Sequence, residues 1–138
     1  MTYNQLVTTL QSLMESHAMI KMVKNATPQE WLFRETQPEF PIALFSINSS
    51  TLNKGLEQIY NIQLFFLDKS GAEMEFEQDV ISDQLQICSD IVGLIRGTKR
   101  AYTIDDEITA NTISDKYEDY LAGVEMTVNI YTQGEWDG

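Results

Sequence analysis

The sequence contains few of the residues that specialised chemistry and unusual environments require. It has one cysteine, Cys88, and one histidine, His17. A single cysteine excludes an internal disulfide and any metal site built from several cysteines. No apolar run approaches the ~18 residues of a membrane-spanning helix, and the N-terminal segment has no basic stretch followed by an apolar one. We therefore expect no membrane association, no signal peptide, and synthesis in a cytoplasm.

Basic residues are also scarce. The chain has 9 Lys and Arg against 21 Asp and Glu, which gives a formal net charge of −12. This balance argues against binding nucleic acid through its phosphates, which requires clustered basic residues, and against an anionic membrane surface. Three interpretations of the acidic charge stay open: solubility, a surface that repels passing DNA, and a surface that imitates DNA.

The residues that are present fit one globular domain. The chain has 138 residues, of which 43% are hydrophobic, and it includes six Phe, six Tyr and two Trp. A domain of this length buries roughly 68% of the surface that its unfolded chain exposes. We therefore predict a single domain over residues 1–138 that folds without covalent cross-links.

Apolar residues at three- and four-residue spacing predict two main helices, over 2–17 and 80–96. Thr2 and Asp79 are the expected N-caps. Thr27 followed by Pro28 predicts a further short helical turn, which ends near Phe33. In the long helix, the expected apolar stripe is Ile81, Leu85, Cys88, Val92 and Ile95, flanked by Val80, Ile87, Ile91 and Leu94.

Alternating apolar residues predict strands between the helices. The clearest strand is 58–68, in which Tyr60, Ile62, Leu64 and Phe66 form one wholly apolar face. Residues 111–123 contain turn-forming and acidic residues. The other expected strands are 19–23, 42–47, 100–109 and 124–131. This order predicts the α+β class, with an antiparallel sheet packed on one face by two main helices.

Catalytic chemistry has two candidate sources. Ser–His or Cys–His catalysis would need His17, with Cys88 or a serine close to it, but no local nucleophile motif is present. Asp105, Asp106 and Glu107 form the tightest acidic triplet and could hold Mg²⁺. Since consecutive strand residues point to opposite faces, a solvated turn is the favoured interpretation. No phosphate-binding glycine motif occurs. We predict no enzyme activity, no cofactor and no metal site.

Several apolar residues are candidates for an interface. In the acidic segment 68–79, Met74 and Phe76 alternate with glutamates and could form an arm that contacts a partner. The Phe40-Pro41 segment precedes the strand 42–47. Trp136, near the C-terminal end, could cover the core or anchor an interface, where Trp is enriched.

Five segments carry a resemblance to a known family. They are an opening helix, the strand EFPIALFSI, the strand YNIQLFFLD, the long helix DQLQICSDIVGLIRG, and the final segment YEDYLAGVEMTVNIY. This order, over about residues 2–132, resembles the tail terminator (tail-completion, or neck ring) proteins of tailed bacteriophages. The style of the sequence is also similar to that of proteins from crAss-like phages.

The resemblance implies a structural virion protein at the junction between tail and neck. It implies a hexameric or dodecameric ring of copies of itself, with the tail tube and the neck or connector proteins as partners. DNA would pass through the ring without specific binding, and the family has no catalytic residues. Two alternatives stay open: a small acidic inhibitor or DNA mimic that binds a basic partner, and, less favoured, a hydrolase built on Asp105.

Overall fold

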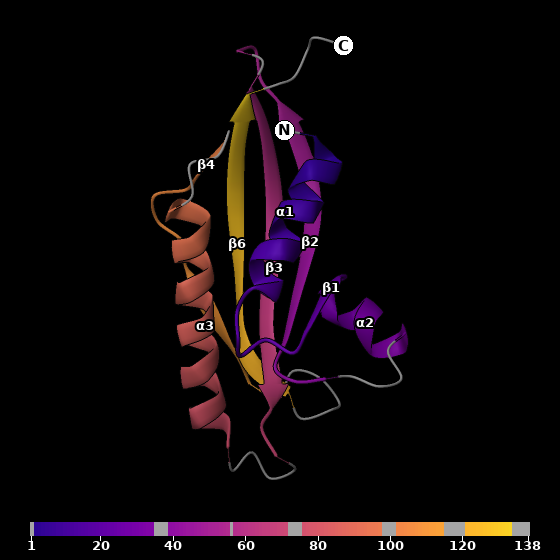
Figure 1. Ribbon diagram of the computed structural model, residues 1–138, viewed down its shortest axis with the longest axis vertical. Coiled ribbons are helices and arrows are strands. Elements are labelled where there is room, and N and C mark those ends of the chain that lie inside the picture. Colours follow the sequence, from indigo (N-terminus) through magenta and orange to yellow (C-terminus); the bar gives the residue numbers. More distant parts are fainter. Residues whose placement is uncertain are drawn as a thin grey trace.

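The computed structural model describes residues 2–34, 39–55, 57–71, 76–97, 102–114 and 121–133. Figure 1 shows two long helices lying along a tall, narrow sheet, with a short helix to one side. The elements in chain order are α1 (Tyr3–Glu15), β1 (Met22–Asn25), α2 (Pro28–Arg34), β2 (Ile42–Leu52), β3 (Glu57–Lys69), α3 (Glu77–Gly97), β4 (Tyr102–Ile104), β5 (Ala110–Ser114) and β6 (Leu121–Gln133).

The strand order in the sheet is β1-β2-β3-β6-β4, and β5 also pairs with β6. Every pairing is antiparallel except that of β1 with β2, which is parallel. The predicted α+β class is thus confirmed, with one parallel strand at the edge of the antiparallel sheet. None of the described helices combines the length and the apolar character needed to cross a membrane.

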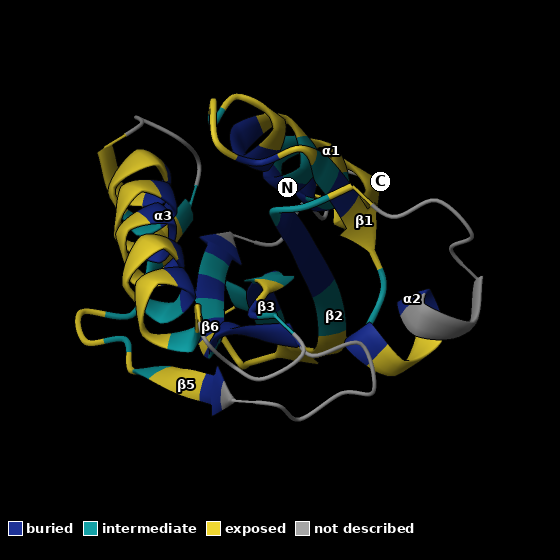
Figure 2. Ribbon diagram, turned by 90° about the horizontal axis from the view of Figure 1, so that it is seen from below, coloured by how far each residue is buried: buried dark blue, intermediate teal, exposed yellow. Residues whose placement is uncertain are grey.

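The main core lies between the sheet and the two long helices. Both helices turn their buried residues toward the sheet and their exposed residues outward (Figure 2). The predicted apolar face of β3 is buried against them, and each such Leu, Ile or Phe contributes about 1.5–3 kcal/mol to folding by leaving water. The strand residues of this core are Val23, Ala43, Phe45, Tyr60, Ile62, Leu64, Phe66, Val124, Met126, Val128 and Ile130.

A second, smaller core covers part of the opposite face. Trp31 of α2 is 3% exposed and packs with Ile42, Leu44, Phe65 and Leu67, which alternate with the residues of the main core. The short helix predicted after Thr27 therefore has a structural function, because it covers part of the sheet face that is opposite to α1 and α3.

Local sequence signals account for the helix starts. Thr2 and Gln5 form a reciprocal capping box at α1. Thr27 Oγ1 accepts a hydrogen bond from the Glu30 N–H at the start of α2, at 3.4 Å. The predicted Asp79 cap is wrong, since α3 already begins at Glu77. Asp79 lies in the first turn instead, where a carboxylate still favours the helix dipole.

The buried line of α3 differs from the predicted stripe. Leu85 and Leu94 are 40% and 39% exposed, while Gln84 is buried. The sheet covers only one narrow line of the helix, and this line lies beside the stripe that the apolar residues suggest. The buried residues are Val80, Gln84, Ile87, Cys88, Ile91 and Ile95.

The strands also differ from the predicted ranges. The polar residues after Ile47 extend β2 to Leu52, with a bulge at Asn48, so β2 and β3 form a long hairpin with a short turn. β1 lies later than predicted. The segment 111–123 contains turn-forming and acidic residues, but its first part belongs to β5 (Ala110–Ser114), because the edge of β6 offers a pairing partner. Gly71, which follows β3, has φ 87°.

Candidate functional site

His17 connects the two long helices. Its Nε2 lies 2.9 Å from Asp90 Oδ2 on α3, and its Nδ1 accepts a hydrogen bond from the Met19 N–H at 3.2 Å. Because Nδ1 is an acceptor, the ring donates from Nε2 to the carboxylate. That hydrogen bond, assisted by one from Gln86, holds the pKa of Asp90 below its usual value. The only histidine of the chain thus has a structural partner on each ring nitrogen.

Cys88 is buried in the main core, at 4% exposure. Its Sγ lies 3.4 Å from Met126 Sδ on β6, which accepts the weak thiol hydrogen bond. Burial raises the pKa of the Cys88 thiol to about 11. A thiol that stays protonated at neutral pH is a poor nucleophile, and its burial agrees with the place of Cys88 in the predicted apolar stripe of the long helix.

Asp105 connects the segment after β4 to β6 at the edge of the sheet. Its Oδ2 accepts a hydrogen bond from the Asn129 N–H at 2.9 Å, and its Oδ1 accepts one from the Tyr131 hydroxyl at 2.6 Å. The bond to this carboxylate, more than burial, raises the pKa of Tyr131. The prediction of a solvated turn is therefore wrong for Asp105, although Asp106 and Glu107 are exposed. The three acids do not converge, and the described residues hold no group suited to a metal ion.

The segment around Asp105 forms a large bulge in the edge strand. Ile104 pairs with Ile130, and Ala110 pairs with Met126, so the five residues 105–109 lie opposite the three residues 127–129. β4 and β5 are thus one edge strand interrupted by two extra residues. Arg96 at the end of α3 donates from Nη2 to the carbonyl oxygens of Asp105 and Asp106, both at 2.8 Å. Asp105 and Arg96 together hold the bulge between α3 and β6.

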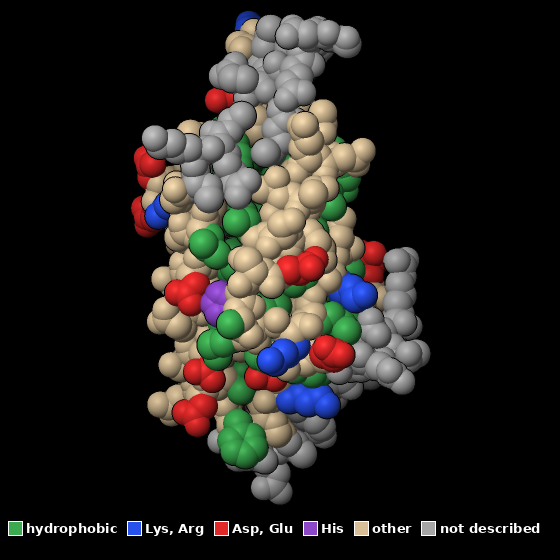
Figure 3. Space-filling model, viewed as in Figure 1, with side chains coloured by type: hydrophobic (Ala, Val, Ile, Leu, Met, Phe, Trp, Pro, Cys, Tyr) green, Lys and Arg blue, Asp and Glu red, His purple; other side chains and the backbone are tan. Residues whose placement is uncertain are grey.

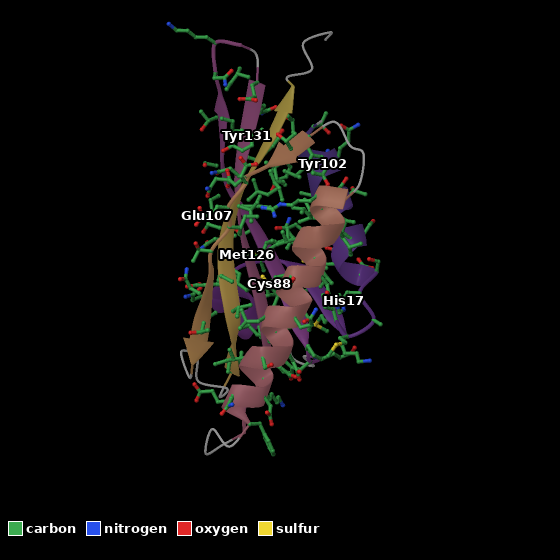
Figure 4. The ribbon with its side chains drawn as sticks, turned by 90° about the vertical axis from the view of Figure 1, so that its left-hand side faces the viewer. His17, Cys88, Tyr102, Glu107, Met126 and Tyr131 are labelled. Atoms are coloured by element: carbon green, nitrogen blue, oxygen red, sulfur yellow. The ribbon has the colours of Figure 1, made fainter. Side chains whose placement is uncertain are left out.

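A groove of about 600 Å³ lies between α3 and this bulge. Cys88 and Met126 lie side by side at the groove, and Glu107 lies on the edge strand (Figure 4). The α3 wall includes Gly93, where an added Cβ would meet nothing within 4 Å. The apolar lining residues are Leu85, Val92, Ile108, Ala110 and Met126, and the charged ones are Arg96, Asp106 and Glu107.

The β2–β3 hairpin extends past both long helices at one end of the molecule (Figure 1). Among the described residues, β1 pairs only with residues 42–45 of β2, so residues 46–52 have β3 on one side and no strand on the other. The Asn53 N–H donates to the Glu57 carbonyl at 3.0 Å. Because antiparallel pairs alternate, the backbone groups of Ser50 and Leu52 point away from β3, toward this open edge.

The predicted interface residues lie in different environments. The Phe40 ring packs edge-on against Trp31, with the two ring centres 5.7 Å apart. Lys69 Nζ lies 5.3 Å from the centre of the Phe40 ring. The Pro41 carbonyl accepts a hydrogen bond from the Lys21 N–H at 2.8 Å. Both residues thus make contacts within the chain.

Of the predicted arm and the C-terminal aromatic residue, the structure describes only Phe76. Phe76, directly before α3, is 56% exposed and available to a partner. Met74 and Trp136 lie outside the described residues. Acidic side chains are spread over the face that carries α1 and α3 rather than gathered in one patch (Figure 3).

No protein-family model matches the chain, and no curated protein is significantly similar to it.

Two surfaces were missed in the sequence: the open edge of β2 and the groove beside the bulge. The edge had a signal, because SINSSTL contains no charged residue and no proline. The groove had none, since it depends on how α3 packs beside a bulge whose register follows from tertiary pairing.

Proposed function

We propose that this chain is a structural protein that assembles with copies of itself into a ring at the tail–neck junction of a tailed phage. In this proposal the protein is part of the virion, contacts the tail tube and neck proteins, and performs no catalysis. DNA passes through the ring.

The observation that carries the proposal is the open edge of β2. Monomeric proteins usually protect such an edge with lysine, proline or an inward charge, because unpaired backbone groups invite another strand. Residues 46–52 have none of these side chains; their one protective feature is the bulge at Asn48. Leu52, at the end of this edge, is 49% exposed. An edge of this kind is suited to pairing with another chain.

The environments of the reactive side chains also support a structural function. Asp105 holds a bulge, His17 joins α1 to α3, and Cys88 packs against Met126. Each of these groups has partners that account for it without a substrate.

The net charge of −12 fits the proposed passage of DNA. A ring with an acidic inner wall would repel phosphates and let DNA slide rather than bind.

The test is the native mass of the purified protein by light scattering over a concentration series, with negative-stain imaging of large species. We expect a closed ring, whose symmetry gives the copy number. Assembly on purified tail or neck proteins would also support the proposal.

A chain that stays monomeric and also binds no tail or neck protein would contradict the proposal. Tight, salt-sensitive binding of such a monomer to a basic protein would favour an acidic inhibitor instead.

A further inference from the structure

We infer that the tip of the β2–β3 hairpin of one copy inserts into the groove between α3 and the bulge of a second copy. Leu52 would enter the apolar part of the groove, and Lys54 would pair with Asp106 and Glu107 at its rim. This inference rests on the proposed self-assembly and names a second contact between copies, next to the open edge of β2.

The groove has the properties of a site for an aliphatic side chain. It is open to solvent, and the side chains of Leu85, Val92 and Ile108 line it. Leu85, on the α3 wall of the groove, is 40% exposed and can contact an incoming side chain. Gly93 widens the groove, because its missing side chain leaves empty space on the α3 wall.

The hairpin tip is accessible to a second copy and is held by hydrogen bonds. It projects past α1 and α3, so a second copy can approach it without meeting the helices (Figure 1). Leu52 is the large exposed hydrophobic residue among those that the structure describes at the tip. Asn53 orders the turn, because its Oδ1 accepts hydrogen bonds from the N–H groups of Gly55 and Glu57, at 3.0 and 3.1 Å. An ordered tip loses less conformational entropy on docking than a flexible loop would.

The charges of the two surfaces are complementary. Lys54 is an exposed cation at the tip, in a chain with only 9 basic residues, and its ammonium has no carboxylate partner among the described residues. Asp106 and Glu107 are exposed, and the structure pairs neither side chain with a cation in the described part of the chain. Arg96 also lines the groove, but its guanidinium donates to the Asp105 and Asp106 carbonyl oxygens, so the two acids still leave the rim negative. Two strongly acidic copies repel each other on average, so a contact that places the cation of one copy against acids of the other also sets their orientation.

The tip and the groove are different surfaces of one molecule, so the contact is heterologous. Each copy offers one tip and one groove, and repetition of the contact produces a closed ring or an open filament. A second copy is therefore the occupant that fits both the charges and the proposed function.

The test blocks each half of the contact separately. Gly93→Leu fills the groove and raises the helix propensity of α3, so this variant is expected to fold. Leu52→Asp places a charge on the tip. The matched controls are Gly97→Leu, at the end of α3 outside the groove, and Leu94→Asp, an exposed leucine of α3 outside the groove. By light scattering, we expect self-association at least ~10-fold weaker for each blocked variant and unchanged for each control.

A mixture of the two blocked variants makes the test specific. In an equimolar mixture, the intact tip of Gly93→Leu can bind the intact groove of Leu52→Asp, so we expect the mixture to associate more strongly than either variant alone. In the same way, Lys54→Glu and Glu107→Lys should each weaken association, and their mixture should restore one contact. Lys21→Glu, which changes an exposed lysine away from both surfaces, is the control for net charge.

The outcomes separate the inference from the proposed function. If the wild type assembles and the blocked variants assemble equally well, the inference is wrong and the proposed function stands. If Leu52→Asp prevents assembly and Gly93→Leu does not, the tip docks elsewhere, which overturns the groove as its site. If the wild type never associates with itself, either alone or together with tail or neck proteins, both the inference and the proposed function are wrong.

Discussion

At the scale of single residues, Gly123 shows how tightly the centre of the sheet is packed. It lies in β6 opposite Leu67 of β3. A Cβ added at this position would lie 1.9 Å from the carbonyl oxygen of Phe66 and 3.1 Å from the Leu67 Cα. Both neighbours are backbone atoms of a central strand, so they cannot move aside as a side chain could.

Gly123→Ala should therefore destabilise the fold severely. We expect the free energy of unfolding to fall by about 3 kcal/mol, which is the upper range for overpacking a well-packed interior. Urea denaturation followed by circular dichroism measures this loss. Gly93→Ala is the control, because a Cβ there meets open space and a helical alanine should raise stability by up to about 1 kcal/mol. Equal effects of the two substitutions would contradict this account of β3 and β6.

Cys88 should report on folding through its reactivity. Since burial raises its pKa from 9.0 to about 11, the folded thiol stays protonated at pH 8 and should react slowly with a thiol reagent. It should react at the normal rate in urea. Fast labelling of the native protein would contradict the described packing against Met126.

The same shift predicts a pH dependence of stability. Between about pH 9 and pH 11 the unfolded thiol ionises while the folded thiol does not, so the contribution of Cys88 is present below pH 9 and is lost as the pH rises through this range. Denaturation curves of the wild type and Cys88→Ala should therefore converge as the pH rises. A constant difference between them would show that the thiol does not titrate in this way.

At the scale of elements, the bulge between β4 and β5 depends on one carboxylate. Asp105→Ala removes the acceptor for the Asn129 N–H and the Tyr131 hydroxyl. We expect a loss of about 1–3 kcal/mol in the free energy of unfolding, because a partly buried donor loses its partner. Tyr131→Phe should cost about 1 kcal/mol, since it removes one hydrogen bond.

Asp106→Ala provides the matched control, because Asp106 is the exposed neighbour and contributes only its backbone carbonyl to Arg96. Its effect should stay within about 0.5 kcal/mol, as is usual for surface positions. If Asp105→Ala were as mild, the bulge would not depend on this carboxylate.

The elements differ in how far the sequence predicts them. α1 follows from its spacing and its Thr2 cap, and the core faces of β3 and β6 follow from alternation, because these signals are local. β5 could not be predicted in this way. Its sequence ANTIS has weak alternation, and it is a strand because β6 presents a free edge beside it. The line that α3 buries likewise depends on where the sheet lies, not on where its leucines lie.

At the scale of the whole molecule, the surfaces proposed for assembly arise from the arrangement of elements. The edge of β2 is open because β1 is short and pairs only as far as Phe45. The groove lies where α3 packs beside the bulge. Both surfaces thus depend on tertiary pairing, whereas Phe40 and Pro41, which the sequence suggests as interface residues, make contacts within the chain.

The most direct test of the central claim, that the open edge of β2 mediates assembly, compares the native mass of two variants by light scattering. Ser49→Lys with Thr51→Lys adds two lysines to the open edge, and Ser12→Lys with Ser82→Lys adds two at exposed helix positions away from it. Both variants change the net charge equally. We predict that the edge variant is monomeric at concentrations where the helix variant and the wild type form the same large species. Equal masses for all three proteins would contradict the claim.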